Sequence, residues 1–89
     1  MNEIQKYIKA RDEMLLKRDV EALRKFVNDH ESYFTADYVK AINNAPANIL
    51  EITLHKMIVN VKSLPKSLKN ESAKWLLDHG YSGEIGVRL

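Results

Sequence analysis

The hydrophobic residues of this chain recur every three or four positions, which is the period of an α-helix with one buried face. This pattern predicts helices over residues 3–17, 20–30, 36–43, 46–62 and 66–79. Asn2, Asp19 and Thr35 precede the first three helices, where their side chains can accept hydrogen bonds from first-turn amides. We therefore expect an all-α fold, a single small bundle of four or five helices.

The first two predicted helices could also form one continuous helix over residues 3–30. Leu16, Val20 and Leu23 keep the helical spacing across the boundary. Asp19, however, is a typical N-cap residue. We therefore favour two helices with a tight break at residues 17–19.

Residues 49–61 (ILEITLHKMIVNV) fit two periods, because their first half alternates like a strand and the whole segment repeats like a helix. A hairpin would turn at His55-Lys56, which offers no glycine or asparagine for the positive φ of a tight turn. The helix is therefore favoured. Ile52 and Val59 fall away from its main apolar stripe, so we expect it to be buried on two sides in the middle of the bundle.

The apolar stripes also predict the core and the domain limits. Gly80 suits the left-handed residue that closes a helix, so we place the bundle domain at residues 1–80 and a short glycine-containing tail at 81–89. This tail either docks on the bundle as an extended strip or stays free. The predicted core is Ile8, Leu15, Leu23, Val27, Val39, Ile42, Leu50, Leu54, Met57, Ile58, Val61, Leu68, Trp75 and Leu76.

Composition narrows the class of protein. Of the 89 residues, 45% are hydrophobic and 29% are charged, which is typical of a globular domain. Cysteine is absent, so disulfides, thiolate metal sites and cysteine nucleophiles are excluded. No apolar run approaches the length of a membrane span, and the first residues lack the pattern of a secretory signal. We expect a cytoplasmic protein without a membrane partner.

Little in the sequence indicates catalysis or a bound metal. No GxSxG, GxxxxGK[ST] or HExxH motif is present, and we expect no cofactor and no enzyme activity. The phrases KFVNDH (25–30) and KWLLDH (74–79) each end in a histidine four residues after an aromatic ring. We interpret both as helix ends, where an imidazole covers the ring one turn back, and not as metal ligands.

Protein–protein interaction is the predicted function, with another protein or a second copy of the chain as partner. The alternating apolar tail is the first candidate surface. Tyr33 and Phe34 are further candidates, although core packing is the favoured interpretation of these aromatic residues. The predicted partner-binding residues are Tyr81, Ile85, Val87 and Leu89.

Nucleic-acid binding without sequence preference is the alternative. Residues 56–74 carry five lysines and one acidic residue, and lysines can hold phosphates. Residues 36–58 have the order of a helix-turn-helix, but the second helix has no Arg or Lys in its first two turns, so base recognition is not expected. The residues of this alternative are Lys62, Lys66, Lys69 and Lys74.

Overall fold

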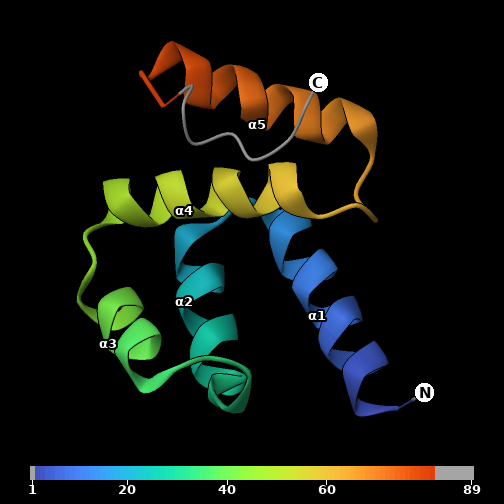
Figure 1. Cartoon of the computed structure of the whole chain (residues 1–89), viewed down its shortest axis with the longest axis vertical. Coiled ribbons are helices and arrows are strands. Elements are labelled where there is room, and N and C mark those ends of the chain that lie inside the picture. The colour runs from blue at the N-terminus through green and yellow to red at the C-terminus, as the bar shows by residue number, and fades with distance from the viewer. Residues whose placement is uncertain (1, 82–89) are drawn as a thin grey trace. The chain divides into compact units, whose positions relative to one another are not determined.

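The computed structural model describes residues 2–81, and within them it confirms the all-α class. Helices make up 80% of the described residues, and none of these residues forms a strand. The five predicted helices are present, with ends within two residues of the prediction (Figure 1). They are α1 (Glu3–Lys17), α2 (Val20–Asp29), α3 (Ala36–Asn44), α4 (Ala47–Asn60) and α5 (Lys66–Asp78), with a short 3-10 helix, η1 (Glu31–Tyr33), after α2.

The helix starts follow from the capping residues. Asn2 and Gln5 form a reciprocal capping box on α1, in which the Gln5 amide donates to Asn2 Oδ1 at 2.8 Å. The side chains of Asp19 and Thr35 accept first-turn amides in α2 and α3. Arg18 ends α1 in the left-handed conformation, with φ 52°, so the continuous helix over residues 3–30 is not formed.

Segment 49–61 is helical through Asn60, as predicted. Leu50, Leu54 and Ile58 are fully buried on one side of α4, and Val59 is fully buried on another. The mixed period of this segment therefore has a simple cause. A helix with two buried sides places apolar residues at positions that a one-sided helix would leave polar.

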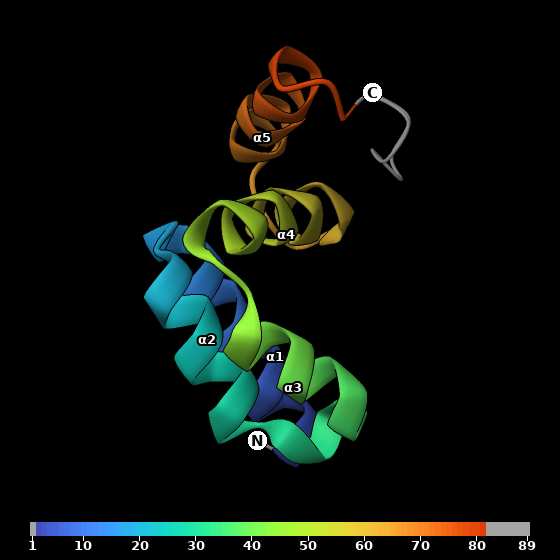
Figure 2. The ribbon, with the colours of Figure 1, turned by 90° about the vertical axis from the view of Figure 1, so that its left-hand side faces the viewer.

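The chain divides into two compact units, Met1–Glu51 and Ile52–Leu89, and the boundary lies inside α4. In the first unit, α2 packs against both α1 and α3 (Figures 1 and 2). In the second, the later turns of α4 pack against α5 around Val59, Ala73 and Leu76. We predicted one domain over residues 1–80. Whether the two units form one domain depends on how they associate, so this stays a prediction.

Four predicted core residues are not fully buried. Ile8 is exposed at the edge of the packed face of α1, and Val39 lines an open groove. Trp75 is half-buried between two histidine rings, and Met57 of α4 is also half-buried. The buried residues that the prediction missed are Met14, Phe26, Val59, Leu64, Ser72 and Ala73.

Among the described residues, no helix is both long and apolar enough to pass through a membrane. Of the predicted tail, only Tyr81 belongs to the described residues.

Candidate functional site

Six aromatic rings from four elements meet in the first unit. We call them the aromatic cluster. Tyr7 of α1 stacks on Tyr33 of η1, with ring centroids 4.2 Å apart and planes 20° apart. Phe34 links Tyr38 to Phe26: its ring stacks on the Tyr38 ring with centroids 5.2 Å apart, and its centroid lies 6.4 Å from that of Phe26. The cluster comprises Tyr7, Phe26, His30, Tyr33, Phe34 and Tyr38.

Burial raises the pKa of two phenols in this cluster. Desolvation is the largest cause for both Tyr7 and Tyr38, and each also faces a neighbouring phenol that disfavours its ionised form. Both hydroxyls therefore stay protonated at neutral pH and add no charge to the cluster.

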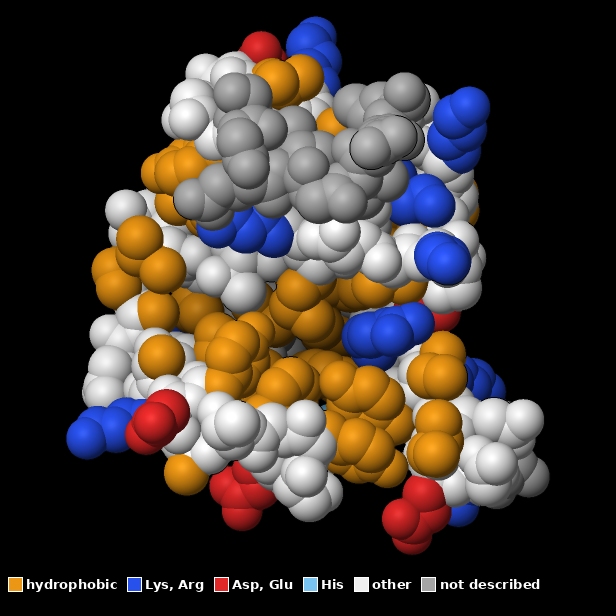
Figure 3. All heavy atoms as spheres, viewed as in Figure 1, with side chains coloured by type: hydrophobic (Ala, Val, Ile, Leu, Met, Phe, Trp, Pro, Cys, Tyr) orange, Lys and Arg blue, Asp and Glu red, His pale blue; other side chains and the backbone are white. Residues whose placement is uncertain are grey.

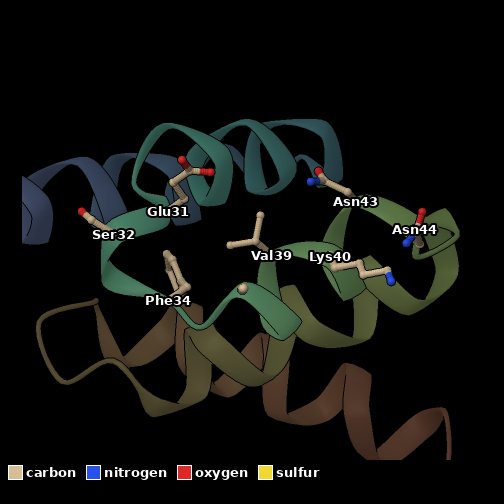
Figure 4. A pocket seen from close by; sticks show the side chains of 8 residues that line it. Glu31, Ser32, Phe34, Val39, Lys40, Asn43 and Asn44 are labelled. Atoms are coloured by element: carbon tan, nitrogen blue, oxygen red, sulfur yellow. The ribbon is translucent and has the colours of Figure 1, made fainter.

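An open groove lies beside this cluster, between η1 and α3, with a volume of about 740 Å³ (Figure 4). We call it the η1–α3 groove. Phe34, Ala36 and Val39 supply its apolar surface. Figure 4 shows Glu31 and Ser32 toward one end and Lys40 and Asn44 toward the other. A concave surface of this size, apolar with a few polar groups, is typical of a binding site.

Hydrogen bonds hold α3 against α2. The amides of Asn28 and Asn43 bond to each other in both directions, at 2.6 and 3.0 Å. Arg24 of α2 donates from its guanidinium to the carbonyl of Ala45, just after α3, at 3.1 Å. Because Phe34 is also fixed by its ring contacts, both sides of the groove are attached to the packed part of the unit.

Four polar side chains of the groove are available to a ligand. The side chains of Glu31, Ser32, Lys40 and Asn44 form no hydrogen bond or ion pair with other residues in the described range 2–81. Ser32 and Asn44 can both donate and accept, which is what a peptide backbone requires. Glu31 and Lys40 add one charge of each sign.

The two repeated phrases end their helices in the same way, as the sequence predicts. The His30 ring lies 4.4 Å from the Phe26 ring with the two planes tilted by 33°, and His79 stacks on Trp75 at 3.9 Å. Each imidazole also donates from Nδ1 to the carbonyl of that aromatic residue, at 2.8 and 2.7 Å. Since a carbonyl can only accept, both rings carry a proton on Nδ1.

Asp29 and His30, which are neighbours in the first phrase, bond to different partners. Asp29 pairs with Lys25 at 2.6 Å, while His30 bonds to the backbone. Within residues 2–81, no group of three or more His, Asp or Glu side chains is placed to hold a metal ion.

The second unit contains one pair that sequence reasoning missed, His55 and Ser72. His55 Nδ1 lies 2.9 Å from Ser72 Oγ, and its ring stacks on Trp75 at 4.3 Å. Serine beside histidine is the geometry of an activated nucleophile, but Ser72 is only 1% exposed, so a substrate has no access to it. The pair instead satisfies a buried hydroxyl. No linear motif marks it, because the two residues lie 17 positions apart.

The predicted partner-binding residues fall mostly beyond the described part. Tyr81 is half-buried against Val59, Ala73 and Leu76, and its amide donates to the Leu76 carbonyl at 2.8 Å. Gly80 has φ 83°, the left-handed conformation expected after α5. Ile85, Val87 and Leu89 lie outside the described residues.

Of the four lysines of the alternative prediction, Lys62 precedes α5 and the other three lie on it. Lys62, Lys66 and Lys74 are exposed, and Lys69 is half-buried. The Lys69 ammonium donates to the Lys62 carbonyl at 3.5 Å, which keeps its charge near Lys62. Three of these four basic side chains are therefore exposed to a ligand.

Comparison with known proteins adds no functional assignment: no protein-family model, curated protein or solved structure matches this chain.

Proposed function

We propose that this protein is a non-catalytic interaction protein that binds a short extended segment of a partner protein in the η1–α3 groove. The observation that carries the proposal is the set of unpartnered polar groups around the apolar surface of that groove. A cytoplasmic setting is part of the proposal, because a cysteine-free chain suits a reducing compartment.

The lining indicates the chemistry of the bound segment. An apolar side chain would rest on Phe34, Ala36 and Val39, where it loses contact with water. Lys40 favours an acidic residue at one end of the groove, and Glu31 favours a basic residue at the other. Ser32 and Asn44 are suited to bond the backbone of the segment.

Selection from a phage-displayed library of random short peptides tests this proposal. We expect enrichment of peptides in which an apolar residue stands between an acidic residue and a basic one. Lys40→Glu should weaken binding of the selected peptides about fivefold or more, because an attractive pair becomes a repulsive one. Fluorescence anisotropy with a labelled selected peptide measures this change.

Two substitutions on α3 separate the groove from the rest of the helix. Val39→Glu places a charge on the apolar surface and should abolish peptide binding, whereas Ala41→Glu lies outside the groove on the same helix and should leave it intact. Circular dichroism establishes that both variants keep their helices. The proposal is wrong if no peptide is enriched, or if the two variants bind the selected peptides equally well.

Phosphate binding by the second unit is the second candidate function. The observation in its favour is the grouping of Lys62 and Lys69, which sits beside the exposed Lys66 and Lys74. At low salt, this surface should retard DNA in a gel at micromolar protein, and added salt should release it. Lys66→Glu combined with Lys74→Glu should remove the retardation. Unretarded DNA at low salt would eliminate this candidate.

A further inference from the structure

A second surface of the first unit lies along α1 and does not belong to the groove. Ile8 and Leu16 are 38% and 55% exposed. Together with Gln5, Lys9, Asp12 and Glu13 they line a shallow depression of about 560 Å³ along the helix. We call these six residues the α1 strip. Figure 3 shows hydrophobic side chains exposed over this helix.

The positions of these residues place them on one side of the helix. Successive members of the strip are separated by one or three positions, so they form a continuous band about 16 Å long. A band of this kind, apolar residues flanked by charges, is the surface with which a helix packs against another helix.

The charged residues of the strip are complementary to those of a second, antiparallel copy of the strip. Lys9 lies toward the start of the strip and Glu13 toward its end, and neither forms an ion pair with other residues in the described range. Asp12 is already compensated, because Arg11 binds its carboxylate at 3.1 Å. Lys9 and Glu13 are therefore the two open charges of the strip, one of each sign.

We propose that the α1 strip binds the α1 strip of a second copy of this chain, with the two helices antiparallel about a two-fold axis. In a two-fold interface every contact occurs twice: if residue i of one copy contacts residue j of the other, residue j of the first copy also contacts residue i of the second. Lys9 of each copy then faces Glu13 of the other, and Ile8 of each copy lies beside Leu16 of the other. A parallel arrangement would instead place like charges together.

The dimer and the groove are independent, because the α1 strip and the η1–α3 groove share no residue. Lys40→Glu should therefore change peptide selection and leave the dimer unaffected. Failure of one proposal leaves the other standing.

Sedimentation equilibrium of the full chain over a range of concentrations tests the dimer. We expect a mass that rises from monomer to dimer with concentration. Lys9→Glu and Glu13→Lys should each weaken the dimer about tenfold or more, because the symmetry turns two attractive pairs into two repulsive ones. Both residues are exposed, so circular dichroism should show unchanged helix content.

Mixing the two variants gives the decisive result. A chain with Lys9→Glu and a chain with Glu13→Lys form both opposite-charge pairs only with each other. An equimolar mixture should therefore form a one-to-one dimer at concentrations where each variant alone is a monomer. The orientation is tested by the single variants, because parallel helices would already pair like charges in the wild-type dimer and neither substitution would add a repulsive pair. A monomeric wild-type chain at all concentrations, or a mixture that stays monomeric, would overturn the proposal.

Discussion

Replacing Leu54 by alanine is expected to lower the free energy of unfolding by about 2–5 kcal/mol. Leu54 is only 1% exposed, and it stands on the fully buried side of α4. Removing the side chain beyond Cβ leaves a cavity that the surrounding residues fill only in part. The loss of stability therefore exceeds the free energy of transferring the removed atoms to water. That loss is a large share of the stability of a small domain, which is about 5–15 kcal/mol.

Urea denaturation followed by circular dichroism measures the effect, and Leu77→Ala is the matched control. Leu77 is 49% exposed on α5, and the same chemical change there should cost less than about 1 kcal/mol. Similar losses in the two variants would show that the side of α4 that carries Leu54 is not a packed core.

The helices could be predicted because the capping residues and the helical spacing of the apolar residues indicate the same helix boundaries. Asn2, Asp19 and Thr35 each cap the helix that the sequence assigns to them. The difficult segment was 49–61, where alternation suggested a strand. The absence of a residue for a hairpin turn decided in favour of the helix, and α4 has that form.

The packing between helices could be predicted only in part. Helical periodicity places residues on a face, but it does not say how far a neighbouring helix extends over that face. Ile8 and Leu15 therefore look equivalent in the sequence, yet Ile8 is exposed and Leu15 is fully buried. Phe26 was missed for a related reason, because its burial depends on rings contributed by α1 and by the segment after α2.

The candidate site was the least predictable feature. Sequence reasoning selected the tail and left Phe34 open between an exposed role and a core role. In the structure Phe34 has both roles, because its ring joins the aromatic cluster and also lines the groove. The groove depends on the reciprocal bonds between Asn28 and Asn43, which lie 15 positions apart, and no local pattern indicates such a pair.

The aromatic cluster yields a second prediction of large effect. Phe26→Ala should lower the free energy of unfolding by about 3–5 kcal/mol. Phe26 is 5% exposed, and its ring lies 4.4 Å from His30 and 5.3 Å from Tyr7. The substitution removes the ring that contacts both Tyr7 of α1 and His30 at the end of α2. Thermal unfolding followed by circular dichroism measures the loss.

Two further variants separate the ring contacts from simple burial. Phe26→Leu keeps an apolar side chain and should lose less than the alanine variant, while Tyr33→Ala removes a ring that is 43% exposed and should cost about 1 kcal/mol. Since Phe26 supports Phe34, Phe26→Leu should also weaken peptide binding in the η1–α3 groove although the protein stays folded. Unchanged peptide affinity in that variant would show that the groove does not depend on the Phe26 ring, and that the contacts of Phe34 with Tyr7 and Tyr38 are enough to hold it.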